Sequence, residues 1–97
     1  MELSLEFEWD PAKAKSNLYK HSVPFLMACE VFKDESRVER VDDFGEHNEE
    51  RWIVLGRIGH TVLSVVFTQR GERIRLISAR RANRDEERTY WTGDLPA

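Results

Sequence analysis

Three strand-like segments follow one another with only two residues between them, and this spacing constrains the fold most strongly. They span residues 51–58, 61–69 and 72–80. Gly59-His60 and Arg70-Gly71 occupy the positions where hairpin turns form. The middle segment, TVLSVVFTQ, is almost wholly apolar, so we expect it at the centre of the sheet with both faces covered. The framework of the fold is therefore a meander of antiparallel strands.

The N-terminal segment predicts a strand followed by a helix. Residues 5–9 alternate apolar and acidic side chains, which is the period of a half-buried strand. Asp10 can cap a helix and Pro11 suits its first position, so we expect a helix to about residue 20. Ala14 and Leu18, four residues apart, would form its narrow apolar stripe.

A second, shorter helix is expected at about residues 24–33, after the proline at position 24 ends the first. Its apolar side chains recur at helical spacing from Phe25 to Phe32. Leu26 and Met27 widen this face, so Phe25, Leu26 and Met27 either belong to a sandwiched core helix or form a patch that binds a partner protein. Cys29 lies on the same face, and we expect it to be a core residue and not a nucleophile.

The remaining segments complete an α+β pattern. Residues 36–42 read as a polar edge strand, and an acidic loop follows them. Asn83 with Glu86 is a capping box that opens a helix to about Trp91, which is polar nearly all round and therefore weakly anchored. The order predicts an α+β domain in which two helices pack on one face of an antiparallel sheet of about four strands.

Length and composition indicate one soluble domain over residues 1–97. Net charge is -3, and no apolar run approaches the roughly 20 residues of a membrane span. The N-terminus lacks the basic and apolar regions of a secretory signal. A single cysteine excludes an internal disulfide, so we expect a reduced, cytoplasmic setting.

Arginine is concentrated in the C-terminal half of this acidic chain. Residues 70–81 carry five of the eleven arginines. Arg73 and Arg75 would lie on the sheet face opposite Ile74, with Arg80 and Arg81 at the end of the strand. These arginines are either solvated side chains that limit aggregation or a phosphate-binding group, because the guanidinium grips phosphate with paired hydrogen bonds.

Two further sets of polar residues suggest chemistry. Lys20 and His21 lie at the end of the first predicted helix, where His21 acts either as a general acid or base or only as a favourable helix-end cation. His47 lies within the acidic stretch 34–50, which carries eight acidic residues. These residues lack the ligand spacing of a calcium loop, so we expect an exposed acidic loop and no metal or other cofactor.

Four stretches resemble the BrnT-type toxins. They are FEWDPAKAKSNLYKH at 7–21, VFKD at 31–34, GEHNEER at 45–51 and TQRGERIRLISARRA at 68–82. The resemblance implies a RelE-like fold and a ribonuclease toxin of a type II toxin–antitoxin pair that arrests translation. It further implies a ribbon-helix-helix antitoxin that neutralises the toxin in a hetero-oligomer, and contact with operator DNA only through that antitoxin. The family usually has Gly-Val-Ser-Phe after its Lys-His pair, whereas this chain has Ser22-Val23-Pro24-Phe25.

The resemblance and the charge pattern together give a hypothesis for metal-independent RNA cleavage. The candidate catalytic residues are His21, Lys20, Glu50, Arg75, Arg80 and Arg81. The residues expected to orient or stack on RNA are Arg51, Arg57, Arg70, Arg73, Tyr90 and Trp91. The alternative is a non-catalytic module of the same fold that binds its antitoxin or RNA without cleaving it.

Overall fold

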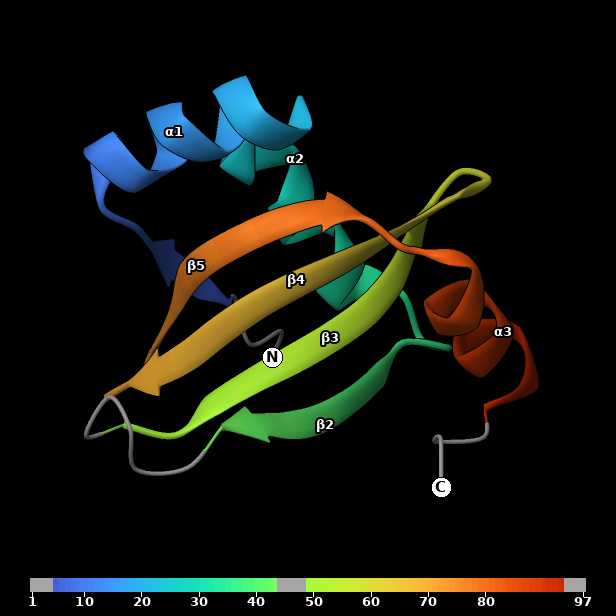
Figure 1. Cartoon of the computed structure of the whole chain (residues 1–97). Coiled ribbons are helices and arrows are strands. Elements are labelled where there is room, and N and C mark those ends of the chain that lie inside the picture. The colour runs from blue at the N-terminus through green and yellow to red at the C-terminus, as the bar shows by residue number, and fades with distance from the viewer. Residues whose placement is uncertain (1–4, 44–48, 94–97) are drawn as a thin grey trace.

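The computed structural model describes residues 5–43 and 49–93, which form a five-stranded mixed sheet in the order β1-β5-β4-β3-β2 (Figure 1). The strands are β1 (Glu6–Glu8), β2 (Val38–Asp43), β3 (Arg51–Ile58), β4 (Thr61–Arg70) and β5 (Arg73–Arg81). The predicted antiparallel meander is confirmed, with β4 at its centre. The first strand, however, joins the same sheet and pairs with β5 in parallel, which makes the sheet mixed.

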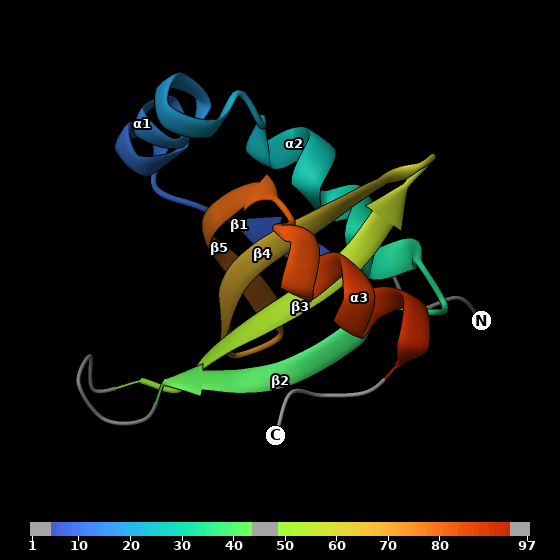
Figure 2. The same cartoon turned by 45° about the vertical axis from the view of Figure 1, so that its right-hand side comes forward.

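The helices lie on both faces of the sheet. On one face pack α1 (Pro11–His21), α2 (Phe25–Ala28) and the 3-10 helix η1 (Cys29–Lys33), which continues α2. On the other face, α3 (Arg84–Thr92) covers one end of β3 and β4 (Figures 1 and 2). Much of that second face, across β5 and the adjoining half of β4, carries no helix in Figure 1.

Short-range signals place the first helix as expected. Asp10 caps α1, and its Oδ1 accepts a hydrogen bond of 2.9 Å from the backbone N–H of Ala12. Ser22 ends the helix in the left-handed conformation, with φ 59°. Glycine adopts this conformation most readily, and here a serine adopts it.

The expected apolar stripe of α1 is only partly correct. Ala14 packs against the core, but Leu18 is exposed, and the residue that α1 buries is Asn17, at 5% exposure. Asn17 makes three hydrogen bonds. Its Nδ2 donates to the carbonyls of Ala79 (2.8 Å) and Val23 (3.0 Å), and its Oδ1 accepts from the Ala79 N–H (3.0 Å).

These bonds substitute for a missing strand. β1 pairs with β5 only as far as Arg75, so the outer edge of β5 has no strand partner further along. An unpaired buried N–H or C=O costs free energy comparable to a lost hydrogen bond. The carboxamide of Asn17 supplies one donor and one acceptor to Ala79, as a neighbouring strand would, and thereby fixes α1 to the sheet edge.

A β-bulge in β5 sets which side chains face each side. Phe67 pairs with Leu76, but Val66 pairs with Ser78, so Ile77 is the extra residue. The bulge shifts the alternation by one, and Leu76 and Ala79 consequently both face the helical core. Beyond the bulge, Ser78 and Arg80 lie on the opposite face.

The second predicted helix is α-helical only over its first turn and then tightens into η1. This 3-10 segment packs closely on β3. A Cβ added at Gly56 would lie 2.6 Å from the Cβ of Val31. Gly56 is therefore required for the close approach of Val31 to the sheet. Within the described residues, no helix is long and apolar enough to cross a membrane.

Replacing Asn17 with alanine should lower the free energy of unfolding by about 2–4 kcal/mol, because both backbone groups of Ala79 lose a buried partner. Urea denaturation measures this change. The control is Ser16→Ala, an exposed neighbour on α1, which should change stability by less than about 0.5 kcal/mol. Equal unfolding midpoints for the Asn17 and Ser16 variants would contradict this role.

Candidate active site

A small pocket of about 190 Å³ lies between α1 and the bulge of β5. Its lining residues are Lys13, Ser16, Asn17, Lys20, His21, Ile77 and Ser78. Lys13, Asn17, Lys20 and His21 are spaced i, i+4, i+7 and i+8, so they share one helical face. Because Asn17 is hydrogen-bonded to β5, it holds α1 and the predicted Lys20-His21 pair next to the strand that contains Arg75 and Arg80.

Arg80 is close to this pocket along the chain. It lies two residues beyond Ser78, which corresponds to about 7 Å along a strand. Lys20 and His21 are solvent-exposed at the pocket rim. The pocket thus brings a histidine and two lysines to the edge of β5, and the backbone position of Arg80 lies two residues further along that strand.

Arg80 is held by α3. Its Nη1 and Nη2 donate to the two carboxylate oxygens of Glu86 at 2.7 and 2.9 Å. Hydrogen bonding to Glu86 raises the pKa of Arg80. Burial acts to raise the pKa of Glu86, but the bonds from Arg80 and from the Asn83 N–H lower it overall. The two guanidinium N–H groups that would bind a phosphate are therefore bonded to the two oxygens of a carboxylate.

The other arginines of the exposed sheet face are also paired with carboxylates. Arg75 donates to Glu8 at 2.9 Å, and Arg73 lies 3.4 Å from Glu6, so both pairs run between β5 and β1. Arg70 is paired with Glu49 at 3.3 Å. The prediction that Arg73 and Arg75 face away from α1 and α2 is confirmed, but their charges are compensated within the fold.

Three predicted residues stand apart from the pocket. Glu50 precedes β3, two strands from β5, and its carbonyl accepts a hydrogen bond from Thr68 (2.7 Å). Arg51 is part-buried, and its Nε has no hydrogen-bond partner among the described residues. Arg81 is exposed and follows Arg80 directly, so it extends toward the helix-covered face.

The two aromatic residues of α3 have different environments. Tyr90 was expected to stack on a base, but it is buried and donates a hydrogen bond of 2.6 Å to the Asp34 carboxylate, so it is not accessible to a base. Trp91 is 58% exposed, and the guanidinium carbon of Arg57 lies 5.5 Å from its ring centroid. Only Trp91 of this pair remains available to a ligand.

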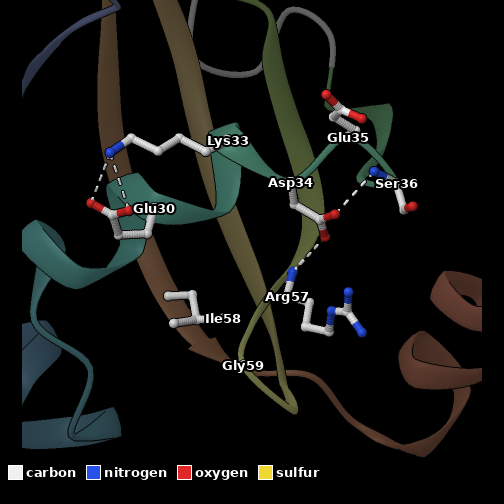
Figure 3. Close-up of a pocket in the computed structure, with 8 residues that line it drawn as sticks. All are labelled: Glu30, Lys33, Asp34, Glu35, Ser36, Arg57, Ile58 and Gly59. Atoms are coloured by element: carbon white, nitrogen blue, oxygen red, sulfur yellow. Dashed lines mark hydrogen bonds and ion pairs between the residues drawn. The ribbon is translucent and has the colours of Figure 1, made fainter.

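A larger cavity, of about 570 Å³, lies beside Asp34 (Figure 3). Its lining residues are Glu30, Lys33, Asp34, Glu35, Ser36, Arg57, Ile58 and Gly59. Both carboxylate oxygens of Asp34 are occupied. One accepts from the Ser36 N–H at 2.9 Å, and the other accepts from the Arg57 N–H at 2.8 Å and from the Tyr90 hydroxyl. Asp34 thus joins η1, β3 and α3 and has a structural role.

The pKa of Asp34 reflects these bonds. Burial acts to raise it, but the three donated hydrogen bonds outweigh burial and leave the pKa below its ordinary value. Burial and the bond to Asp34 raise the pKa of Tyr90. The pair is therefore held as a carboxylate and a neutral phenol at neutral pH.

The apolar face of α2 is divided between core and surface. Phe25 is buried and its ring packs edge-on against Trp9, whereas Leu26 and Met27 are 73% and 40% exposed. A groove beside them is lined by Leu5, Phe7, Trp9, Leu26, Cys29, Glu30 and Lys33. Phe25 therefore belongs to the core, and the surface available to a partner consists of Leu26 and Met27. Burial raises the pKa of the Cys29 thiol, which disfavours a thiolate nucleophile.

Within residues 5–43 and 49–93, no group of three or more histidine, cysteine or acidic side chains could hold a metal ion. His47 and Glu46, which belong to the acidic stretch considered as a metal site, lie outside the described residues.

The sequence model of one protein family matches residues 9–86, and that family is described as the ribonuclease toxin, BrnT, of type II toxin–antitoxin systems. The chain belongs to this family. No curated protein matches the chain. The family match spans α1, the β5 bulge and the first turn of α3, so every residue of the α1–β5 pocket and the Arg80–Glu86 pair lies within it. At the level of the family, the chain is a ribonuclease toxin with an antitoxin partner and an RNA target.

Sequence reasoning missed three structural residues that build this region. The position of Asn17 could have been noticed in the sequence, because it is a polar residue on the same helical face as Lys13 and His21. Glu86 was assigned only as a helix cap, although it also pairs with Arg80. Asp34 was counted only as part of the acidic stretch, because nothing local shows that its partner is Tyr90.

Replacing Asp34 with asparagine should lower the free energy of unfolding at pH 7 by about 1–3 kcal/mol, because a carboxylate that accepts three hydrogen bonds becomes a neutral amide. The depressed folded-state pKa stabilises the protein above about pH 4 and ceases to do so as pH falls through the folded value. The deficit of the variant should therefore shrink in acid. Urea denaturation at pH 7 and pH 3 measures it.

Glu35→Gln provides the control, because Glu35 is an exposed carboxylate in the same cavity. It should change stability little at either pH. A deficit for Asp34→Asn that stays constant from pH 7 to pH 3 would contradict the assignment.

Proposed function

We propose that this toxin is an endoribonuclease that cleaves RNA without a metal ion at the α1–β5 pocket. The observation that carries the proposal is the position of Lys20 and His21. The Asn17 anchor holds α1 at the β5 bulge, so that both line one pocket with Ile77 and Ser78, two residues before Arg80 in β5. The family description as a ribonuclease toxin gives the reaction class.

The proposed reaction is an internal phosphoryl transfer. A base removes the proton of a ribose 2′-hydroxyl, whose oxygen attacks the adjacent phosphorus and forms a 2′,3′-cyclic phosphate. The bond to the 5′-oxygen breaks, and an acid protonates that leaving oxygen. His21 transfers protons, with Lys20 beside it as the second donor. Glu50 lies outside the pocket, and we therefore assign it no step.

The phosphate oxygens gain charge in the transition state, and guanidinium groups stabilise that charge. Arg80 is the nearest candidate along β5, with Arg75 before the bulge and Arg81 at the end of the strand. The Arg80 side chain is 40% exposed, so a phosphate can reach it, but it must replace Glu86. Arg75 must likewise exchange Glu8. Arg81 makes no ion pair among the described residues and is free to bind at once.

One observation favours the alternative of a non-catalytic module. The imidazole of His21 has no hydrogen-bond partner among the described residues, whereas a catalytic histidine is usually oriented by a third group. An RNA-binding or antitoxin-binding domain would need the positive surface but no oriented histidine. Cleavage by the purified protein distinguishes the two.

We further propose that cleavage arrests translation in the cytoplasm and that a ribbon-helix-helix antitoxin neutralises the toxin. The family description supports an antitoxin partner. The surface we assign to it comprises Leu26 and Met27, because large exposed apolar side chains beside an apolar groove are typical of protein interfaces. Operator DNA would be contacted only through the antitoxin.

Alanine at His21, Lys20 or Arg80 should each reduce RNA cleavage by the purified protein by at least about 100-fold, because general acid–base catalysis and charge stabilisation each contribute that much. Cleavage of a labelled RNA, with and without EDTA, measures the effect, and growth after induction gives the cellular readout. Wild-type cleavage should persist in EDTA.

Glu86→Gln is the matched control for Arg80→Ala, because both variants break the same ion pair. Glutamine also retains the capping box. Both should show similar melting temperatures, but only Arg80→Ala should lose activity. Equal losses of activity in the two variants would show that Arg80 acts only by holding α3. A fully active His21→Ala variant would refute the role of His21 in proton transfer.

Replacing Leu26 and Met27 with serine should weaken antitoxin binding by at least about tenfold, since truncated hot-spot side chains cost more than 1 kcal/mol. Titration calorimetry with the protein encoded by the neighbouring reading frame measures this. Leu18→Ser, an exposed leucine on α1, should leave the affinity unchanged. Unchanged affinity for the Leu26 and Met27 variant would place the antitoxin elsewhere.

A further inference from the structure

The outward side of α1 combines positive charge with an exposed aromatic ring. Tyr19 is 90% exposed, more than any other large hydrophobic side chain in the described residues. The helix carries Lys13, Lys15 and Lys20 and no acidic residue. None of these lysines forms an ion pair with another described residue, whereas Arg73, the equivalent exposed cation on β5, is paired.

Tyr19 lies next to the pocket wall on the helix surface. It follows Ser16, which lines the pocket, by three residues and Lys15 by four, and side chains at these spacings are neighbours. It is two residues from Asn17, so it faces away from the sheet. An RNA strand that leaves the pocket across α1 would therefore pass Lys20 and Ser16 and reach the ring of Tyr19.

The charges favour single-stranded RNA over a protein as the occupant. Sites for single strands combine cations that follow the phosphates with aromatic side chains on which bases stack. The lysines of α1 supply uncompensated cations, and Tyr19 supplies the ring. Trp91, the other exposed aromatic residue considered for stacking, already has a cation over its ring, because the guanidinium carbon of Arg57 lies 5.5 Å from the ring centroid.

We infer that Tyr19 is a base-stacking residue that holds a nucleotide flanking the cleavage site, and that Lys15 binds the adjoining phosphate. The inference rests on the proposed function, because it describes the path across the protein of an RNA strand that is bound at the α1–β5 pocket. Tyr19 thereby positions the RNA and favours unpaired over paired substrates, because a stacked base must be free of its own helix.

Fluorescence anisotropy with a short, labelled 2′-O-methyl RNA tests the inference. This probe lacks the 2′-hydroxyl and cannot be cleaved, so binding is read separately from catalysis. Tyr19→Ala and Tyr19→Leu should bind about 5- to 150-fold more weakly, the loss expected for one stacked base. Tyr19→Phe and Tyr19→Trp should bind within about twofold of wild type, because both rings can still stack.

Two matched controls identify stacking as the cause. Leu18→Ala shortens another exposed apolar side chain of α1 and should leave affinity unchanged. An abasic probe, tested position by position, should bind wild type more weakly at one position and should bind Tyr19→Ala no more weakly there. Because Tyr19 is so exposed, all variants should melt within a few degrees of wild type.

Each outcome has a distinct meaning. If Tyr19→Ala binds RNA as well as wild type, or loses affinity only for the antitoxin, the stacking inference is wrong and the proposed ribonuclease is unaffected. Absence of RNA binding by wild type overturns the inference as well. If Tyr19→Ala loses RNA binding but wild type cleaves nothing, the stacking role stands and the proposed catalysis fails.

Discussion

The carboxamide of Asn17 takes the place of a strand at the edge of β5. β1 is only three residues long and ends opposite Arg75, so the rest of β5 would otherwise leave buried backbone groups unpaired. The amide bonds both backbone groups of Ala79 and also holds the carbonyl of Val23, where the chain turns toward α2. One side chain therefore fixes the helix that carries Lys20 and His21 and the loop that follows it.

Charge pairing compensates most of the arginines on the exposed sheet face. On the exposed sheet face, Arg73 and Arg75 are matched by Glu6 and Glu8 across the parallel β1–β5 pair, and Arg80 is matched by Glu86. These pairs are partly exposed, so they contribute little to stability, and a phosphate can compete for the arginine. The lysines of α1 have no such partners among the described residues, and this difference favours RNA on the helix over the open sheet.

The sequence predicted the elements whose signals are local. The two hairpins, the Asp10 cap and the Asn83–Glu86 capping box all depend on residues within a few positions of one another, and all are confirmed. The contacts between Asn17 and Ala79 are 62 residues apart, and no periodicity in α1 indicates that a polar residue should be its buried one. The parallel pairing of β1 with β5 was missed for the same reason, since it joins the first and last strands of the sheet.

Long-range partners also decided which predicted site residues remained available. Tyr90 and Trp91 are adjacent and were equivalent by sequence, but Asp34, 56 residues away from Tyr90, binds its hydroxyl and removes it from the surface. Arg75 and Arg80 were predicted as free phosphate ligands because sequence spacing does not show that Glu8 and Glu86 lie opposite them. Ser22, by contrast, takes the left-handed conformation that glycine favours, so the helix ends where the sequence predicted.

The anchoring of α3 shows how Arg80 can exchange its partner without loss of the fold. The polar sequence of α3 predicted a weakly held helix, but Tyr90 anchors it. Its ring is buried with Ile53, Leu55 and Val62, and its hydroxyl donates to Asp34. The bond from the Asn83 N–H to Glu86, at 2.8 Å, closes the first turn of the helix itself. Neither contact involves Arg80. A phosphate that takes the Arg80 guanidinium therefore leaves the anchor and the cap intact, and α3 can stay in place while the arginine binds RNA.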